Sequence, residues 1–351
     1  MRIDKDIKLD FNDILIKPKV TTNIISRSEI NPFLDNGKLP LFTAPMDTVV
    51  DTSNFELFLD LGVNVVLPRG EQVSNTDVFT SYSLKEFKDK FITFGNIDIP
   101  NGERLSVLID TANGHIDDLI KTTTKAKKLY GKKMVLMVGN VANPKTYTEL
   151  SLAGADLIRI GVGNGNACLT TQQLGIGYPM GSLIHECYTE SLSLDKPAKI
   201  IADGGMKDYS DIIKALALGA DYVMIGSIFN KCVESCGENY LKTNGTPIKI
   251  SQKEAINHYY HGDLGEGKVM KLFRGMSTKE VQKKWGNSKL KTSEGVVKYR
   301  EVEFGLPGWL ENFESYLRSA MSYTNSRTLN EFINTSEFVR ITDNAFNRFN
   351  K

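Results

Sequence analysis

The chain has 351 residues, a formal net charge of +1 and a hydrophobic fraction of 41%. This length permits either one barrel-sized domain or two smaller domains, and the composition can bury a large core. The near-neutral charge gives no electrostatic reason to expect nucleic acid as a partner. No apolar run reaches the ~18 residues that a membrane helix needs. The N-terminus does not have the apolar core that a signal peptide would have.

Short apolar runs alternate with amphipathic stretches along the chain. Eight runs predict strands, at residues 39–47, 63–68, 104–110, 133–140, 155–163, 198–205, 220–227 and 268–276. Most of these runs are continuously apolar, as strands of a buried parallel sheet are. Between them, residues 208–218 predict a helix with one apolar face, which Gly219 can close. This alternation predicts a (β/α)8 TIM barrel, with a doubly wound parallel sheet as the alternative.

The C-terminal third departs from the regular alternation. Residues 229–267 predict a helix followed by an insertion. The polar, glycine-punctuated segment 277–303 predicts a mobile flap over the barrel mouth, because loops of this length are usually functional or disordered. Residues 309–332 predict one or two helices. Since no linker separates a second domain, we expect a single catalytic domain over residues 1–351.

Cysteine and histidine spacing does not indicate a zinc site. The chain has four cysteines without the paired spacing of a metal or disulfide framework, at positions 168, 187, 232 and 236. We therefore expect reduced thiols in a cytoplasmic protein. Cys232 and Cys236 fall on a stretch that reads as a helix. His258 and His261 are three residues apart, but no third ligand accompanies them.

The stretch GVGNGNACLTTQQLGIGYP, residues 161–179, places five glycines around Cys168. Glycine lets a backbone bend sharply and approach a ligand closely. Loops that follow barrel strands share the face where active sites lie. A thiolate is a nucleophile that amide dipoles stabilise, and the Thr170 hydroxyl can transfer a proton. Cys168 is therefore a candidate nucleophile; the alternative is a flexible loop with an incidental cysteine.

Two further loops have the residue types of a nucleotide site. Asp203 can bind vicinal ribose hydroxyls, and Gly204 and Gly205 can bring amides to a phosphate. Gly226 and Ser227 follow the next predicted strand, near the usual phosphate site of such barrels. Asp203 could instead cap a helix. Glu294 is either a proton carrier on the flap or a solvated charge.

An ordered set of motifs over nearly the whole chain resembles the IMP dehydrogenase and GMP reductase superfamily. The motifs are DFNDILIKPK (10–19), SRSE (26–29), APMDTV (44–49), DTANG (110–114), GNV (139–141), the cysteine loop through GIGYP, IIADGG (200–205), GADYVMIGS (219–227), RGMS (274–277) and SEG (293–295).

Several features favour the reductase branch of this family. The short spacing between residues 68 and 104 leaves no room for the regulatory domain of the dehydrogenases, and residues 277–293 contain no Arg-Tyr pair. SAMSYT (319–324) and FVRIT (338–342) look more like the dehydrogenase. The alternatives are thus an IMP dehydrogenase without its regulatory domain, or a catalytically silent purine-nucleotide-binding protein.

The resemblance implies a mechanism for reductive deamination of GMP to IMP. Cys168 attacks C2 of the guanine ring, and Thr170 and Glu294 move protons as ammonia leaves. A covalent thioimidate remains, which a nicotinamide cofactor reduces. NADPH is the expected cofactor, with NADH as the alternative.

The resemblance also implies binding residues and assembly. The substrate residues are Asn166, Asp203, Gly204, Gly205, Gly226, Ser227, Gly275, Met276 and Ser277. The cofactor residues are Ser26, Arg27, Arg69, Asp110, Thr111, Ala112, Val162 and Gly163. Carbonyls of Gly163, Gly165 and Cys168 fit a monovalent cation such as potassium. We expect a homotetramer in which Ser26 and Arg27 reach a neighbouring subunit's cofactor.

Two positions depart from the family pattern. The family usually has serine where Asn166 stands, although an amide can also bind phosphate. The basic segment after the second predicted strand is LPRGEQ here, in which only Arg69 matches.

Overall fold

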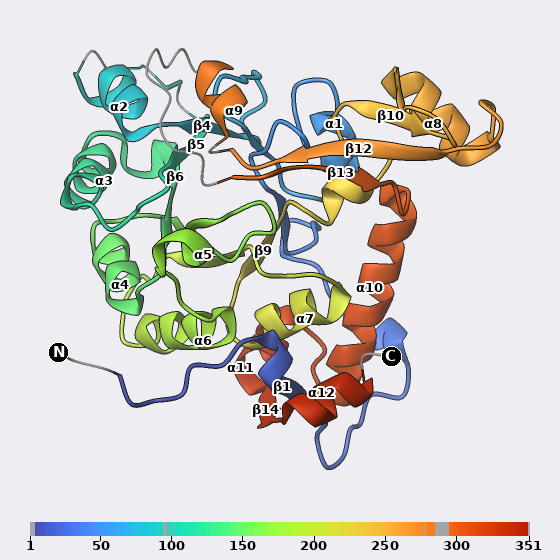
Figure 1. Cartoon of the computed structure of the whole chain (residues 1–351). Coiled ribbons are helices and arrows are strands. Elements are labelled where there is room, and N and C mark those ends of the chain that lie inside the picture. The colour runs from blue at the N-terminus through green and yellow to red at the C-terminus, as the bar shows by residue number, and fades with distance from the viewer. Residues whose placement is uncertain are drawn as a thin grey trace.

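The computed structural model describes residues 4–93, 97, 99–100, 102–276, 278–284 and 295–349. Its centre is an eight-stranded parallel sheet in the order β2-β9-β8-β7-β6-β5-β4-β3. An isolated parallel bridge between Phe42 and Asn64 joins β2 to the segment before β3, so the ring closes. The prediction of a (β/α)8 barrel is therefore confirmed (Figure 1).

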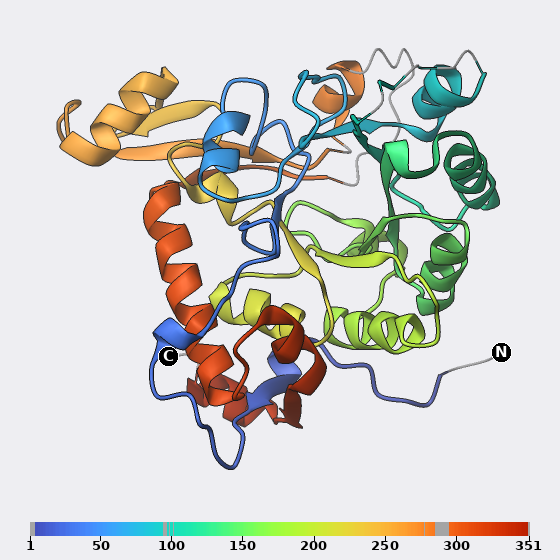
Figure 2. The same cartoon turned by 180° about the vertical axis from the view of Figure 1, so that it is seen from behind.

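The barrel strands are β2 (Leu41–Thr43), β3 (Val66–Leu67), β4 (Phe79–Tyr82), β5 (Leu105–Asp110), β6 (Met134–Val141), β7 (Leu157–Ile160), β8 (Lys199–Asp203) and β9 (Tyr222–Ile225). The helices around them are α1 (Phe55–Asp60), α2 (Leu84–Phe87), α3 (Asp117–Tyr130), α4 (Pro144–Leu152), α6 (Met180–Ser191), α7 (Tyr209–Ala217) and α10 (Leu306–Tyr323). A π-helical turn, η3 (Lys88–Thr93), extends α2, and a short 3-10 helix, η4 (Gly131–Lys133), follows α3. Figures 1 and 2 show these helices on the outside of the sheet.

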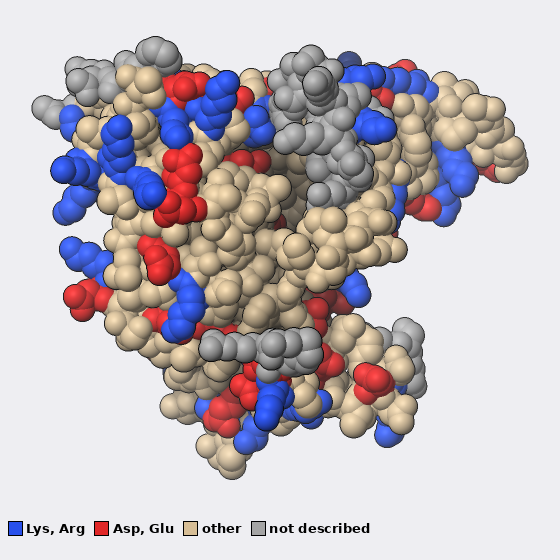
Figure 3. Space-filling view, turned by 60° about the vertical axis from the view of Figure 1, so that its left-hand side comes forward, with Lys and Arg blue, Asp and Glu red and all other residues tan. Residues whose placement is uncertain are grey.

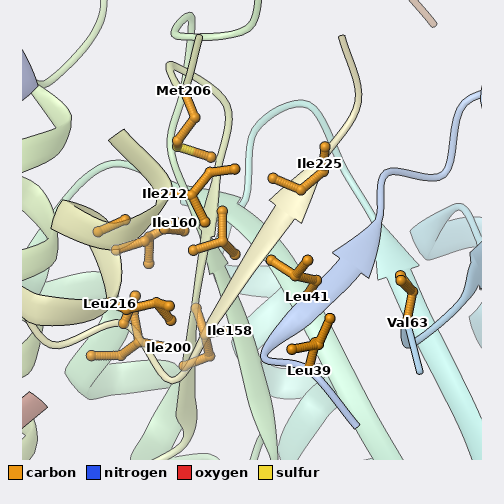
Figure 4. Packing of buried hydrophobic residues seen from close by; sticks show 14 of the residues in the cluster. Leu39, Leu41, Val63, Ile158, Ile160, Ile200, Met206, Ile212, Leu216 and Ile225 are labelled. Atoms are coloured by element: carbon orange, nitrogen blue, oxygen red, sulfur yellow. The ribbon is translucent and has the colours of Figure 1, made fainter. Parts of the chain in front are cut away.

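Both faces of the barrel strands are buried, which explains their continuous apolar runs. Along β6, Leu136 and Val138 belong to the large core between strands and helices, whereas Met137 points to the smaller core inside the barrel. The inner core consists of Phe42, Ala44, Val66, Phe79, Leu108, Met137, Leu157, Ile201 and Met224. Figure 4 shows part of the outer core, in which α7 covers the strands: Leu41, Ile158, Ile160, Ile200, Ile212, Leu216 and Ile225.

The sequence missed one barrel strand and assigned another strand to the barrel that lies outside it. Residues 79–82 form a barrel strand that the sequence did not indicate, because Thr80 and Ser81 are polar, although both are buried. The predicted eighth strand, 268–276, is instead β12 (Lys268–Arg274) of a separate antiparallel sheet. The sequence placed the Cys168 loop after the fifth predicted strand (155–163), but this strand, β7, is the sixth strand of the barrel. The Asp203 and Gly226 loops follow the seventh and eighth strands.

The antiparallel sheet rises beside the barrel mouth, in the order β11-β10-β12-β13. It contains β10 (Asn239–Lys242), β11 (Ile248–Ile250) and β13 (Val297–Glu301) in addition to β12, and α8 (Gln252–His261) packs on it. The helix predicted to start near residue 229 is only a 3-10 turn, η5 (Phe229–Lys231), and Cys232 and Cys236 lie in the irregular segment after it. Part of the predicted flap is described, namely α9 (Lys279–Lys284) and β13, but Ser277 and Glu294 lie outside the described residues.

Two strands from near the opposite ends of the chain pair below the barrel. The 3-10 helix η1 (Phe11–Asp13) precedes β1 (Ile14–Lys17), which pairs antiparallel with β14 (Glu337–Arg340). A second 3-10 helix, η2 (Arg27–Glu29), follows on the N-terminal arm. The predicted C-terminal helices are confirmed as α10 and α11 (Leu329–Thr335), and α12 (Asp343–Phe349) follows. Among the described residues, none of the helices combines the length and the apolar character that spanning a bilayer requires.

The first turn of α7 contains a buried acid whose titration affects stability. Asp208 caps the helix by accepting the backbone N–H of Asp211 at 3.1 Å, and Asp211 accepts the N–H of Lys207 at 3.0 Å. Burial, and then the charge of Asp208, raise the pKa of Asp211 from 3.8 to about 6. Between these two pH values the folded state binds the proton and the unfolded state does not, so stability falls as pH rises.

We expect Asp211→Asn to stabilise the protein at pH 7–8, because it removes the cost of ionising this side chain while an amide oxygen can still accept from Lys207. The gain in free energy of unfolding should be on the order of 2–3 kcal/mol above pH 6 and should vanish toward pH 4. Urea unfolding at several pH values measures it. A gain that is independent of pH would contradict this assignment.

Candidate active site

A cavity of about 970 Å³ opens at the carboxyl ends of the barrel strands. Residues that lie at the end of, or soon after, each of the eight strands line it, as expected for the mouth of such a barrel. The end of β12 contributes Phe273, Gly275 and Met276. Over the face in Figure 3, Lys and Arg are intermixed with Asp and Glu instead of forming one basic area.

Cys168 is the exposed member of the four free cysteines. Its Sγ lies 3.2 Å from the Thr170 hydroxyl, which begins the short helix α5 (Thr170–Leu174). Burial raises the pKa of the Cys187 thiol and raises that of Cys232 to about 12. Cys236 is partly buried, and desolvation raises its pKa as well. Among the four thiols, Cys168 alone therefore combines exposure with a place in the cavity.

The glycines of the Cys168 loop are required by close backbone approaches. At Gly163, where φ is +81°, a Cβ would lie 1.9 Å from the Thr171 hydroxyl. At Gly161, where φ is +127°, a Cβ would lie 2.2 Å from the carbonyl oxygen of Asp203. The loop thus folds back on its own helix and onto the end of β8. These contacts place the Cys168 loop and Asp203 side by side.

Backbone pairing joins the Cys168 loop to residues 295–296, the part of the predicted flap that leads into β13. Cys168 forms an antiparallel bridge with Gly295, and the N–H of Val296 donates to the Ala167 carbonyl at 3.1 Å. The N–H of Gly275 in turn donates to the Val296 carbonyl at 3.1 Å. The predicted nucleophile and Gly275, predicted to contact the base, therefore lie on adjacent backbone segments.

The predicted phosphate residues come together on one side of the cavity. Asn166 donates from Nδ2 to the Ser227 hydroxyl at 2.9 Å, and both residues line the cavity with Gly204, Gly205 and Gly226. Gly204 and Gly205 both have positive φ, near +90°. Sequence reasoning missed Arg300, which lies over the Phe273 ring and donates to the Ser227 carbonyl at 2.9 Å.

Three other polar residues join Asp203 in one network. Arg159 donates to Asp110 Oδ1 at 2.7 Å and to Asp203 Oδ2 at 2.7 Å, and Asn140 donates to the same Asp203 oxygen at 2.7 Å. The sequence analysis did not single out Arg159 or Asn140. A signal was available for Arg159, because a cation in the apolar run LIRI must find a partner when the strand is buried.

An ion pair attaches the antiparallel sheet to the barrel. Arg274, at the end of β12, pairs with Asp47, which follows β2. Close by, the buried Asn230 donates to the Thr48 carbonyl at 2.8 Å and to the Leu272 carbonyl at 3.0 Å. These contacts hold Gly275 and Met276 at the mouth.

Most of the predicted cofactor residues line the same cavity. Asp110, Thr111, Ala112, Val162, Gly163 and Arg69 do so, and Ser83 and Lys85 join them. The Arg69 guanidinium lies 3.3 Å from Glu86.

Ser26 and Arg27 are not brought to this cavity. They belong to the N-terminal arm, where η2 packs against α10 and the Arg27 carbonyl accepts from Arg318 at 3.4 Å. Their role at a cofactor site therefore stays a prediction about a neighbouring subunit.

The predicted cation ligands Gly163, Gly165 and Cys168 all lie in the cavity loop. The Gly165 carbonyl accepts the Cys168 N–H at 2.9 Å. Within the described ranges, no cluster of three or more His, Cys, Asp or Glu side chains is arranged for a metal ion. The monovalent-cation site stays a prediction, since it would rest on carbonyl oxygens.

Comparison with known proteins agrees with this geometry. The model of the IMP dehydrogenase / GMP reductase domain matches residues 103–349. A mouse GMP reductase 1 is 30% identical, with 97% of each chain covered. A GMP reductase of Caenorhabditis elegans is 29% identical over 97% of this chain and 94% of its own length. A GMP reductase of Shewanella halifaxensis is 29% identical over 100% of both chains. The chain belongs to the IMP dehydrogenase / GMP reductase family.

Proposed function

We propose that this protein catalyses the reductive deamination of GMP to IMP and ammonia with NADPH. The observation that carries the proposal is the exposed Cys168 thiol, 3.2 Å from the Thr170 hydroxyl, in a cavity that also contains Asp203 and the Asn166–Ser227 pair. The residues proposed as nucleophile, ribose acceptor and phosphate site thus line one cavity. The full-length similarity to proteins named GMP reductase supports the choice of substrate.

The residues can act in the following order. Asp203 accepts the ribose hydroxyls, while Ser227, Asn166 and the amides of Gly204 and Gly205 hold the phosphate. The Cys168 thiolate then forms a bond to C2 of guanine. Thr170, with Glu294 as its proposed partner, delivers a proton to the amino group as the C2–N bond breaks and ammonia leaves. Covalent capture at sulfur divides the exchange into two easier steps.

The reduced nicotinamide, when bound, supplies the hydride that reduces the covalent thioimidate at C2. The cavity volume of about 970 Å³ lies at the upper end of the usual range for ligand sites, so it has room for a nicotinamide beside a nucleotide. Asp110, Thr111, Ala112, Val162 and Gly163 line the part of the cavity proposed for it. As hydride arrives, the C2–S bond breaks, and Cys168 leaves as a thiolate ready for the next cycle.

A homotetramer in the cytoplasm is part of the proposal. Val20 and Ile25 on the N-terminal arm are 98% and 97% exposed, although aliphatic side chains gain free energy by burial. They flank the segment that leads to Ser26 and Arg27, which do not line their own cavity. Docking of this arm on a second copy would bury the aliphatic pair and supply Arg27 to the neighbouring cofactor. Potassium held by carbonyls of Gly163, Gly165 and Cys168 would fix the loop.

Cys168→Ala should lower the turnover number by several orders of magnitude while GMP still binds, because the covalent route is lost. Steady-state NADPH oxidation and calorimetric titration with GMP measure the two effects. Cys187→Ala is the matched control, since this thiol is buried away from the cavity, and its turnover should be close to that of the wild type. A Cys168→Ala turnover within about tenfold of the wild type, or about 1.4 kcal/mol of barrier, is incompatible with the assignment.

Thr170→Val should slow ammonia release more than hydride transfer, because the hydroxyl serves the proton transfers of deamination. Single-turnover experiments that follow ammonia and NADPH in the same sample separate the steps. If the hydride step slows and ammonia appears at the wild-type rate, Thr170 has a different role.

Arg69→Ala should raise the KM for NADPH more than that for NADH and leave the KM for GMP nearly unchanged. A guanidinium makes permanent, bidentate contacts with phosphate, and NADPH has the additional 2′-phosphate. Arg340→Ala, on β14 away from the cavity, is the control. Equal effects on both cofactors would show that Arg69 does not read this phosphate.

A further inference from the structure

One buried cation connects the two halves of the cavity. Arg159 lies on β7, whose other residues Leu157, Ile158 and Ile160 are apolar, and the whole arginine is 7% exposed. A buried guanidinium is costly unless charged partners and hydrogen bonds compensate it. An aliphatic residue would match the apolar neighbours on β7, but it would leave Asp110 and Asp203 without their cation, so the arginine serves these two cavity residues.

Arg159 reaches carboxylates on two different strands. Nη1 donates to Asp110 Oδ1 at 2.7 Å, at the end of β5. Nη2 and Nε donate to Asp203 Oδ2 at 2.7 and 3.2 Å, at the end of β8. Burial acts to lower the pKa of Arg159, but the charges of Asp203 and Asp110 outweigh it, so the pKa is raised and the group stays a cation.

Each carboxylate bonds to this network through one oxygen only. Asp203 Oδ2 also accepts from Asn140, which in turn donates to the Gly161 carbonyl at 3.0 Å. Within the described residues, no hydrogen bond reaches Asp203 Oδ1 or Asp110 Oδ2. Both aspartates line the cavity and are partly exposed, with side-chain exposures of 15% for Asp203 and 22% for Asp110.

We propose that Arg159 is a positioning residue that couples the nucleotide half of the cavity to the cofactor half through Asp203 and Asp110. The proposal rests on the proposed function, in which Asp203 holds the ribose of GMP and Asp110 lies on the nicotinamide side. When ribose hydroxyls donate hydrogen bonds to Asp203, they weaken the hydrogen bonds that Asp203 accepts from the Arg159 guanidinium. Because the guanidinium is planar and rigid, the change is passed to its bond with Asp110.

Thermodynamic linkage makes this coupling reciprocal, so a change at Asp110 alters the affinity for the nucleotide. Lysine cannot replace Arg159 in this role, because an ammonium is a compact point charge without the rigid fork that holds two carboxylates at once.

The test measures the dissociation constant of GMP by calorimetry in four proteins: wild type, Asp110→Asn, Arg159→Lys and the double variant. Asp110→Asn alone should change the constant by about threefold or more, although Asp110 does not hold GMP. In the Arg159→Lys background the same replacement should change it by less than about 1.5-fold. An equal effect in both backgrounds, or no effect in either, would overturn the coupling.

A reciprocal measurement keeps Arg159 intact, in case Arg159→Lys does not fold. Asp203→Asn should change the dissociation constant of NADP+ by about threefold or more, and an unchanged constant would overturn the proposal. Lys127→Gln is the matched control, because its ion pair with Asp156 at 2.7 Å lies at the opposite end of the barrel. The Asp110→Asn effect on GMP should persist in that background, and its loss there would count against Arg159 as the specific link.

Failure of the coupling and failure of the proposed function give different results. If the wild type binds neither GMP nor NADP+, the proposed function is wrong, and the coupling falls with it. If the wild type binds both ligands but the variants show no dependence on Arg159, the coupling alone is wrong.

Discussion

A barrel interior that is filled with side chains is the constraint on which the rest of this structure depends. Phe42, Leu108, Met137 and Ile201 occupy the space inside the strands, so no ligand can enter there. Polar groups on the strands must then reach the carboxyl ends, where water and ligands have access. Asp110 and Asp203 stand at those ends, and Arg159 extends from within a strand to meet both.

Close packing at the mouth explains how one loop serves several groups. The Cys168 loop lies so near the end of β8 that Gly161 has no space for a side chain. The same loop pairs with Gly295 and approaches Gly275. The Cys168 sulfur, the proposed ribose acceptor Asp203 and the proposed base site are thus positioned by backbone contacts, which side-chain motion does not disturb. The Asp47–Arg274 ion pair fixes the antiparallel sheet to the barrel in a similar way.

Sequence patterns were sufficient to predict those barrel strands that are apolar on both faces, such as β6. They failed for β4, because buried Thr80 and Ser81 look like loop residues, and for β12, because Leu272 and Phe273 are buried in a sheet outside the barrel. Glycine clusters revealed the loops after β7, β8 and β9, since close backbone approaches leave a mark in the sequence.

The residues that the sequence analysis missed have no clear local pattern in the sequence. Asn140 and Arg159 sit inside or at the end of apolar strands, and only the three-dimensional arrangement brings them to Asp203. Arg300 lies about 70 residues from Ser227 in the chain, yet it donates to the Ser227 carbonyl, a contact that no local pattern predicts. Ser26 and Arg27 lie on an arm away from the cavity, so their predicted contact with a cofactor stays a prediction about a neighbouring subunit.

The most direct test of the central claim is the stoichiometry of one reaction mixture. Purified protein is incubated with GMP and NADPH, and IMP, ammonia and NADP+ are quantified together. The account predicts one IMP and one ammonia for each NADPH oxidised. Unchanged NADPH in the presence of GMP, together with reduction of NAD when IMP is supplied, would contradict it.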